Sequence, residues 1–565
     1  MKINEIEKIT GLTQKAIRLY ESKGLISVSR EENGYRNYTE KDAETLKTVK
    51  LLRSIGTPIP DIKLYLYGVI SLAELTDKRM CEILKESGKT SEQYLLCERI
   101  ATDGVTTPTS SEDVFTESED EKPSTHGAIS VGIDIGTTTV SAAVMDIDNC
   151  EQLEVYSLPH DSRVSNGIFS EQSVSVILEK SEKLLSHILR CYDGVVSIGI
   201  SGQMHGILYI NANGEPLSEL INWQDKRADQ PLSNGSSTCE EIFRITGERV
   251  STGYGIATHY YNLKNGLVPE NASGICSIMD AFAMRICNLK KAKTHSTVAA
   301  SFGLFDVTEN RFMEEKLALL QISPKILPQL TSESETVGEY NGIPVSVAIG
   351  DNQAGVFGNL RESENPVLIN IGTGSQVSTV SDFKAVSSPL ELRPFVGGRY
   401  LICGSALCGG FAYSMLESFF RAYTVSAGVH EKAQYGIMNR IAAEAYEKGE
   451  KGLSVDVSFC GKRSDPNCRG SVSMIDRENF TPAALTLGVL KGMCEELYEL
   501  YSAFPEKSTV ALASGGAVRK NPLLKTLLEE RFGIPVSVNT VDEEAATGAA
   551  LFSALCINYK KENKK

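Results

Sequence analysis

The feature that most constrains this chain is an apolar run that ends in an acid and turns at once into glycine and threonine. Residues 131–140 read VGIDIGTTTV, which places Asp134, Gly136, Thr137 and Thr138 where a strand would end. Backbone N–H groups and hydroxyls at such a turn can bind phosphate, and the carboxylate can hold Mg²⁺ through water. An ordinary β-turn explains so short a pattern as well, so its weight depends on the rest of the chain.

A second carboxylate comes from residues 347–354, which read VAIGDNQA. Gly350 permits a sharp turn at a strand end, and Asp351 follows it. This aspartate can accept the proton of an attacking hydroxyl while Mg²⁺ and backbone donors stabilise a transferred phosphoryl group, and Asn352 can orient the substrate. A plain helix N-cap is the alternative for Asp351. Together the two segments suggest phosphoryl transfer to an alcohol.

Two segments between them suit a sugar. Residues 199–206 read GISGQMHG, with Gln203 and His205 at the tip, and residues 222–227 read NWQDKR, with Trp223 close to Asp225. Amide and imidazole groups suit sugar hydroxyls, an indole gives a flat apolar wall, and a carboxylate can bind adjacent hydroxyls. A structural histidine and a core tryptophan are the alternatives.

Two glycine turns in the second half of the chain suit a nucleotide. The run INIGTGSQVS places Gly372 after an apolar strand, and ASGGAVRKN (513–521) places Gly515 and Gly516 where a planar adenine can lie against the backbone. The phosphate-type turns at Gly136 and Gly372 suit a pseudo-duplicated enzyme of two lobes with nucleotide in the cleft. A plain glycine turn is the alternative at Gly515.

Strand-like and helical runs alternate after residue 128, which predicts α/β layers. The apolar runs cover residues 129–133, 195–200, 345–349, 367–371 and 509–513, and helical stretches include 174–189 and 485–501. Before them, residues 102–126 are rich in Thr, Ser and Pro and hold seven acids against one base. That composition predicts a disordered linker.

Composition excludes several classes of protein. The chain has 565 residues and a net charge of -15, which argues against a surface that binds nucleic acid throughout. No apolar run approaches the roughly 18 residues that span a bilayer, and no signal peptide precedes Asn4, so we expect no membrane partner. The thirteen cysteines lack zinc-finger spacing, which predicts free, mostly buried thiols in a reducing cytoplasm.

The first 65 residues differ from the rest, with twelve Lys or Arg against nine Asp or Glu. Residues 3–10 and 13–20 predict two short helices joined at Gly11, with Thr13 capping the second, as in a helix-turn-helix. Residues 29–38, SREENGYRNY, predict a hairpin wing. Its side chains Arg30, Tyr35, Arg36 and Tyr38 can reach phosphates. A solvated helical hairpin is the alternative.

Residues 1 to about 68 closely resemble the MerR-type winged helix-turn-helix. The matching pieces are AIRLYESKGLI (16–26), GYRNYTEKD (34–42) and the helix over 46–52 followed by Arg53. The resemblance implies a homodimer that binds a palindromic promoter element, with residues 70–100 as a dimerising connector. It places Arg18 and Tyr20 near the DNA groove and Tyr35, Arg36 and Tyr38 in the wing.

Residues from about 128 to 555 resemble the FGGY carbohydrate kinase family. The segments GIDIGTTT, SGQMHG, WQDKR, GDNQAG, IGTGSQ, SGGAVRKN and EEAATGAAL follow the family's order. The resemblance implies ATP and Mg²⁺ as cofactors, Asp134 as metal ligand and Asp351 as base. It further implies Thr137, Thr138, Thr373 and Gly374 at the phosphates, Met204, His205 and Asn352 at the sugar, and Gly515, Gly516 and Asn521 near the adenosine.

The fold class implied is α/β, a two-lobe sugar kinase of the actin/ribonuclease-H-like type preceded by a small, mainly α winged helix-turn-helix domain. We expect a DNA-binding domain over residues 1–69, a helical connector over 70–100, an acidic linker over 101–127, and kinase lobes over 128–360 and 361–558.

The same resemblance narrows the choice of sugar that accepts the phosphoryl group. The GQMHG form is shared by kinases of xylulose and sedoheptulose, whereas glycerol kinases carry Arg-Glu at two of these places, and runs such as TGYGIATHYYNLK (252–264) look more like sedoheptulokinases. The leading hypothesis is an ATP-dependent ketose kinase, with sedoheptulose first, whose DNA-binding domain couples sugar sensing to transcription. The alternatives are a xylulokinase, a MerR-type regulator whose kinase-like body only senses sugar, and an actin-like ATPase, which GQMHG and GDNQAG disfavour.

Overall fold

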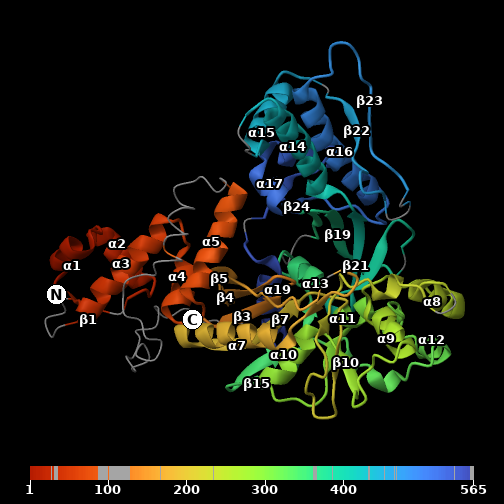
Figure 1. The fold of residues 1–565 in the computed structure, drawn as a ribbon, viewed down its shortest axis with the longest axis horizontal. Coiled ribbons are helices and arrows are strands. Elements are labelled where there is room, and N and C mark those ends of the chain that lie inside the picture. Colours follow the sequence, from red (N-terminus) through yellow and green to blue (C-terminus); the bar gives the residue numbers. More distant parts are fainter. Residues whose placement is uncertain are drawn as a thin grey trace.

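The computed structural model has two α/β lobes and a small helical unit at one side (Figure 1). It describes residues 1–26, 28–30, 36–86, 100, 127–165, 167–232, 235–360, 365–384, 386–429, 433–450, 452–462, 465, 467–539 and 541–559. The predicted linker up to residue 126, most of the connector after residue 86, Tyr35 and the side chain of Arg30 lie outside the described residues. Within the described ranges, no helix is long and apolar enough to cross a membrane.

The N-terminal unit forms the predicted helix pair and wing. Helix α2 (Gln14–Ser22) follows α1 (Ile3–Thr10), and the Thr13 hydroxyl caps α2 by accepting the N–H of Ala16 at 3.2 Å. Strands β1 (Ser29–Arg30) and β2 (Arg36–Asn37) pair antiparallel as the wing. The unit continues with α3 (Glu40–Ser54), α4 (Ile59–Leu66) and α5 (Leu72–Glu86).

The first lobe is built on a sheet with the order β15-β16-β7-β3-β4-β5, and β17 also pairs with β7. The strands are β3 (Ile129–Ile135), β4 (Thr139–Asp146), β5 (Glu151–Pro159), β7 (Val195–Gly202), β15 (Thr336–Tyr340), β16 (Ile343–Ser346) and β17 (Ile349–Gly350). Helices α7 (Val174–Cys191) and α10 (Ile278–Ile286) cover one face, and α19 (Glu544–Cys556) covers the other (Figure 1). The apolar runs predicted as strands at 129–133 and 195–200 therefore form the centre of this sheet.

The second lobe repeats the scheme with the order β20-β21-β19-β18-β24-β25. Its strands are β18 (Val367–Ile371), β19 (Ser375–Ser381), β20 (Glu391–Pro394), β21 (Tyr400–Ala406), β24 (Ala511–Ser514) and β25 (Val536–Val538). Its main helices are α14 (Gly409–Ser426), α15 (Tyr435–Glu447), α16 (Pro482–Ser502) and α18 (Pro522–Phe532). The predicted α/β class with two lobes is confirmed.

Helix α19 ties the two lobes together, because it follows the second lobe in the chain but packs on the sheet of the first. Its sequence, EAATGAALFSALC, is rich in small residues. A Cβ atom on Gly132 of β3 or on Gly199 of β7 would overlap the carbonyl oxygens of Ala546 and Ala549 in this helix. Glycine at these two strand positions lets the helix backbone lie directly on the sheet.

The substitution Gly132→Ala should lower the free energy of unfolding by about 1–3 kcal/mol, because overpacking forces helix and sheet apart. Gly436→Ala, near the start of α15, is the matched control, since a Cβ there meets no atom within 4 Å. Urea unfolding followed by circular dichroism measures both variants. A Gly132→Ala protein as stable as the wild type would show that α19 does not need this close approach.

Candidate active site

The carboxyl ends of three parallel strands meet at one edge of the first-lobe sheet. Strand β7 lies between β3 and β17, and its Ser201 pairs with Asp134 on one side and with Ile349 on the other. The Ser201 hydroxyl donates to Asp134 Oδ1 at 2.7 Å. Helix α13 (Asp351–Phe357) starts directly after β17 with Asp351. The two predicted carboxylates are thereby brought to the same edge.

Both carboxylates have raised pKa values. Burial raises the pKa of Asp134 to about 7, the charge of Asp351 adds to this, and the Ser201 hydrogen bond opposes it. Burial raises the pKa of Asp351 to about 6, against the Asn352 N–H, which donates to Asp351 Oδ1 at 2.6 Å, and against the charge of Arg393. Two desolvated carboxylates that repel one another favour a nearby cation.

The donor set fits a hydrated hard cation better than a closed metal cage. Among the described residues, no group of three or more His, Cys, Asp or Glu side chains is arranged to hold a metal. Mg²⁺ keeps several of its waters and is commonly held by one or two carboxylates together with substrate phosphates. Asp134, whose pKa rises when no counter-charge is present, fits this role.

The loop after β7 brings the predicted sugar residues next to these carboxylates. Met204 is buried and packs so closely on Gly350 that a Cβ there would lie 2.6 Å from Met204 Sδ. The buried Gln203 side chain donates from Nε2 to the Gly136 carbonyl at 3.2 Å, and its Oε1 has no partner in the described part of the chain. An unpaired buried oxygen at this place indicates a polar ligand or water.

His205 is held by the loop rather than left to rotate. Its Nδ1 donates to the carbonyl of Ser301 at 2.9 Å, its backbone N–H donates to Ser301 Oγ at 3.0 Å, and its ring stacks on Tyr254 at a centroid distance of 4.5 Å. The backbone of His205 has a φ of 73°, which few non-glycine residues adopt. Strained backbone of this kind is concentrated at functional sites.

Trp223 lies at the phosphate turn and not in the core. Its side chain is 46% exposed, and its indole N–H donates to Thr137 Oγ1 at 3.0 Å. The core alternative for this tryptophan is therefore wrong, and the predicted apolar wall stands beside the turn that follows β3.

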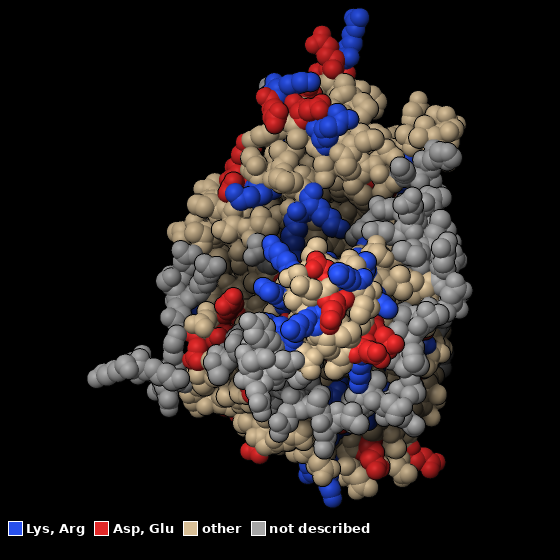
Figure 2. All heavy atoms as spheres, turned by 90° about the vertical axis from the view of Figure 1, so that its left-hand side faces the viewer, with Lys and Arg blue, Asp and Glu red and all other residues tan. Residues whose placement is uncertain are grey.

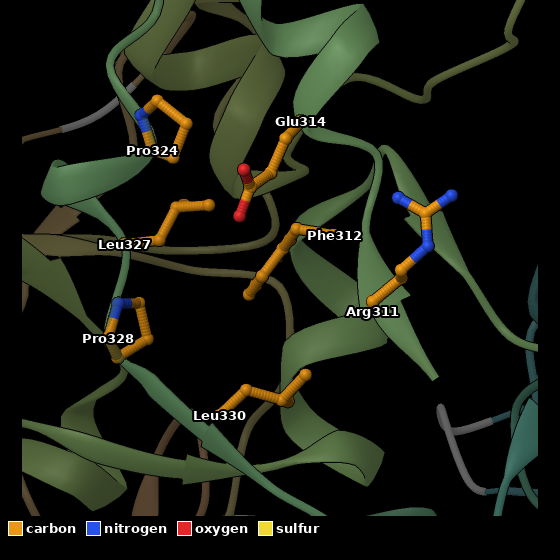
Figure 3. A pocket seen from close by; sticks show the side chains of 7 residues that line it. All are labelled: Arg311, Phe312, Glu314, Pro324, Leu327, Pro328 and Leu330. Carbon is orange, nitrogen blue, oxygen red and sulfur yellow. The ribbon is translucent and has the colours of Figure 1, made fainter. Parts of the chain in front are cut away.

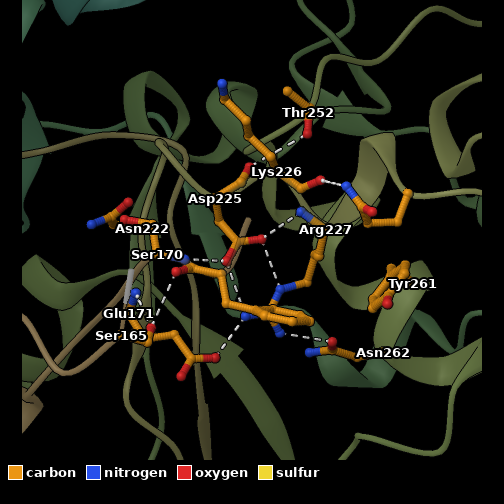
Figure 4. Close-up of polar contacts among 12 residues, drawn as sticks. Ser165, Ser170, Glu171, Asn222, Asp225, Lys226, Arg227, Thr252, Tyr261 and Asn262 are labelled. Carbon is orange, nitrogen blue, oxygen red and sulfur yellow. Dashed lines mark hydrogen bonds and ion pairs between the residues drawn. The ribbon is translucent and has the colours of Figure 1, made fainter. Parts of the chain in front are cut away.

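Asp225 corrects one of the sequence-based predictions. Its carboxylate is fully buried and accepts from the N–H of Ser170 at 2.8 Å and from Arg227 through the backbone N–H, Nε and one terminal nitrogen at 2.9, 2.8 and 3.0 Å (Figure 4). Arg227 in turn contacts Glu171 at 2.6 Å. Because both carboxylate oxygens are used by these donors, Asp225 positions the loop and does not bind sugar hydroxyls.

The predicted nucleotide residues meet at the carboxyl ends of β18 and β24. The N-terminus of α14 closes on the turn after β18, where the Gly410 N–H donates to the Gly372 carbonyl at 2.8 Å and the Phe411 N–H donates to the Thr373 carbonyl at 3.0 Å. Gly374 completes this turn before β19. The N–H groups of Gly410 and Phe411 are used within the protein, so the backbone of the glycine turn itself is the part that is suited to phosphate.

The adenosine segment fits a ligand on two observations. Gly515 has a φ of 95°, and the Cβ position of Gly516 faces open space with no atom within 4 Å. The side chain of Asn521 is buried, and its Nδ2 has no partner in the described part of the chain. Across the cleft, Asn352 of α13 lies 3.4 Å from Gln376 of β19, which joins the two lobes beside Asp351.

Gln172 and His160 are site residues that the sequence does not reveal. Gln172, in β6 (Glu171–Gln172), donates to the Thr137 carbonyl at 2.7 Å and accepts from Gln203 at 3.1 Å and from Asn222 at 3.2 Å. His160 Nε2 donates to the Gly136 carbonyl at 3.1 Å, and its backbone N–H donates to the Thr138 carbonyl at 3.0 Å. Neither belongs to a glycine segment, so only the fold places them here.

The predicted DNA-contacting residues divide into two groups. Arg18 is exposed on α2, and Arg36 pairs with Glu21 at 2.8 Å while staying 35% exposed. Tyr20 and Tyr38 are buried in the core of the unit, so the prediction that they contact DNA is wrong. Figure 2 shows Lys and Arg intermixed with Asp and Glu on this side of the molecule.

Two hollows lie outside this edge. One, of about 470 Å³, is lined by Arg311, Phe312, Glu314, Pro324, Leu327, Pro328 and Leu330 (Figure 3). The other, of about 350 Å³, is lined by residues that include Tyr209, Arg227 and Asn262. Neither is lined by Asp134 or Asp351, so the strand-end geometry and not cavity size identifies the candidate site.

Family models agree with this geometry. The model of the FGGY family of carbohydrate kinases, N-terminal domain, matches residues 129–358, and that of the C-terminal domain matches residues 367–556. Together they cover about three-quarters of the chain. The model of the MerR HTH family regulatory protein matches residues 1–68. The chain belongs to the FGGY family of carbohydrate kinases, is a carbohydrate kinase by that membership, and carries a MerR-type helix-turn-helix.

Individual relatives are similar at low identity. A sedoheptulokinase of Homo sapiens is 26% identical over 75% of this chain and 96% of its own length, and a glycerol kinase of Trichlorobacter lovleyi is 25% identical over 66% and 78%. A xylulose kinase structure from Lactobacillus acidophilus superposes with a TM-score of 0.65 and 18% identity over 77% of this chain and 90% of its own. That last similarity concerns the fold alone.

Gln172→Leu should reduce kcat/KM at least about tenfold, because four polar partners, Thr137, Ser162, Gln203 and Asn222, lose their hydrogen bonds and each orphaned group costs about 1–3 kcal/mol. Gln329→Leu is the matched control, since Gln329 is exposed on β14 (Gln329–Thr331). Steady-state kinetics of both variants provides the comparison. An unchanged kcat/KM for Gln172→Leu would remove Gln172 from the site.

Proposed function

We propose that this protein is an ATP-dependent ketose kinase that phosphorylates sedoheptulose, and that sugar occupancy alters DNA binding by its N-terminal domain. The observation that carries the proposal is the pair of carboxylates, Asp134 and Asp351, at one sheet edge beside Met204. Met204 belongs to the predicted sugar loop, and an actin-like ATPase would not need such a loop beside the two carboxylates.

Asp351 is the proposed general base. Its Oδ1 is fixed by the Asn352 N–H, and its Oδ2 accepts no hydrogen bond from the described residues, so Oδ2 is the atom available for the proton of an attacking hydroxyl. The raised pKa of about 6 makes the carboxylate more basic than an exposed aspartate yet ionised at neutral pH.

The other residues bind and orient. Asp134 would hold Mg²⁺, the turn at Gly372 to Gly374 would bind phosphates, and Gly515, Gly516 and Asn521 would lie at the adenosine. Bound ATP and Mg²⁺ supply the phosphoryl group and neutralise its charge. Met204, His205, Asn352 and Trp223 enclose the sugar, which excludes water from the acceptor hydroxyl.

Sedoheptulose is favoured over glycerol because the loop carries Met204 and His205 where glycerol kinases have Arg-Glu. It is favoured over xylulose because runs such as residues 252–264 look more like sedoheptulokinases, and a sedoheptulokinase relative aligns over 96% of its own length. Small differences in pocket contacts separate substrates within a family, so xylulose is the alternative acceptor.

The proposal predicts that purified full-length protein with Mg²⁺-ATP forms ADP with sedoheptulose at a higher kcat/KM than with xylulose, and none above background with glycerol. A coupled ADP assay across these three sugars, with mass spectrometry of the product, measures it. A higher kcat/KM for xylulose would make xylulose the substrate in place of sedoheptulose. No turnover with any ketose would favour a regulator that only senses sugar.

Asp351→Asn should lower kcat by at least about a hundredfold while sugar still binds, because general-base catalysis contributes about 10²–10⁴-fold and the amide keeps the shape of the side chain. Turnover and calorimetric sugar binding are measured on the same preparation. Asp382→Asn, on an exposed carboxylate of the second lobe, is the control. Turnover equal to wild type would refute the assignment of Asp351 as base.

A further inference from the structure

The N-terminal unit packs against the kinase through buried charge. Lys63 of α4 contacts Glu154 of β5 at 3.1 Å, and their side chains are only 10% and 11% exposed. Glu154 also accepts from the hydroxyls of Tyr156 at 2.6 Å and Tyr192 at 2.7 Å. Burial opposes the charge of Glu154, but Lys63 and the two hydroxyls outweigh it and lower the pKa of this carboxyl. A buried pair with this many partners is costly to separate.

A second lysine covers the edge of the kinase sheet. Lys78 of α5 donates to the Ser157 carbonyl on β5 at 2.7 Å and to Asp61 of α4 at 2.8 Å. Strand β5 is the edge strand of the first-lobe sheet. An edge strand leaves backbone carbonyls without a partner strand, and here Lys78 of the DNA-binding unit donates a hydrogen bond to one of them.

Ser157, whose carbonyl Lys78 contacts, is linked through cross-strand pairs to Asp134, the proposed metal ligand. Ser157 of β5 pairs with Ser141 of β4, and Ser141 pairs with Asp134 of β3. The Ser141 hydroxyl donates to Ser157 Oγ at 3.3 Å. A continuous line of paired residues therefore runs from Lys78 to the candidate active site.

Tyr67, directly after α4, touches both the kinase and the helix-turn-helix. Its ring lies 5.0 Å from the ring of His187 in α7, centroid to centroid. Its hydroxyl donates to the Gly24 carbonyl at 3.0 Å, in the turn that follows α2. In the helix-turn-helix, the second helix is the one that enters the DNA groove.

From these contacts we infer that the face of the kinase formed by β5 and α7 is a docking surface for the DNA-binding domain, and that the Lys63–Glu154 and Tyr67–Gly24 contacts carry the coupling between sugar site and DNA. This inference rests on the proposed function, and it names the route of that coupling. The docked arrangement provides a defined contact between the DNA-binding domain and the kinase, whose geometry both sites can change.

Coupling of this kind is reciprocal. If Mg²⁺-ATP and sugar change the DNA affinity by some factor, DNA changes the affinity for those ligands by the same factor, and factors of about 5–150 are usual. Weakening the Lys63–Glu154 or Tyr67–Gly24 contact should bring this factor in DNA affinity toward one. None of these residues is among those proposed to bind substrate.

The test uses the full chain and a labelled duplex selected by it from a random library. Fluorescence anisotropy gives the DNA dissociation constant with and without Mg²⁺-ATP and sedoheptulose, for the wild type, Lys63→Met and Tyr67→Phe. Tyr67→Phe keeps the ring that lies beside His187 and removes the hydroxyl that donates to the Gly24 carbonyl. Lys183→Met is the control, because the Lys183–Glu179 pair lies on the same α7 helix but both side chains are 57% exposed.

We expect the ligands to shift the wild-type and Lys183→Met dissociation constants at least about fivefold, and the shift to fall below about twofold in Tyr67→Phe and Lys63→Met, with kcat and KM unchanged. A full shift in both variants would overturn this route while leaving the proposed function intact. No shift in an active, DNA-binding wild type would overturn the coupling itself. A shift without turnover would support the route and favour the sensor over the kinase.

Discussion

The parallel pairing of β7 with both β3 and β17 brings the two acidic strand ends together. It places Ser201 between the two strands that carry the acids, so that Asp134 and Asp351 come to one edge although more than 200 residues separate them in the chain. Ligands of open α/β sheets bind outside the carboxyl ends of the strands. The predicted sugar loop lies at this edge, because Met204 packs on Gly350.

Helix α19 packs closely on β3 and β7, the strands that lead to this edge. The glycines at residues 132 and 199 let the helix backbone lie on β3 and β7, and Ser553 of α19 forms hydrogen bonds with Ser130 at 2.8 Å and Ser197 at 2.9 Å. Because α19 belongs to the end of the chain, it fixes the second lobe relative to the carboxylates. Beside Asp351, the second lobe contacts the first through Asn352 and Gln376, at 3.4 Å.

The sequence was sufficient for elements with strong local signals and insufficient for contacts made by the fold. The strand runs, the helix-turn-helix with its Thr13 cap, and the glycine turns were predictable because each depends on a few adjacent residues. The burial of Tyr20 and Tyr38, the pairing of Asp225 with Arg227, and the position of Gln172 were not, because each depends on partners distant in the chain. The docking of the DNA-binding unit on β5 belongs to the same class, since nothing near Lys63 in the sequence indicates Glu154 as its partner.

Asp351 is the proposed base, and it lies in a desolvated position at this edge. The most direct measurement is the pH dependence of kcat/KM for sedoheptulose at Mg²⁺-ATP concentrations far below the KM for Mg²⁺-ATP, because the rate then reports the free enzyme. A base must be deprotonated, and burial raises the pKa of Asp351 to about 6, so kcat/KM should rise about tenfold per pH unit below about 6 and level off above it. A flat profile from about pH 5 to 8 would contradict the account.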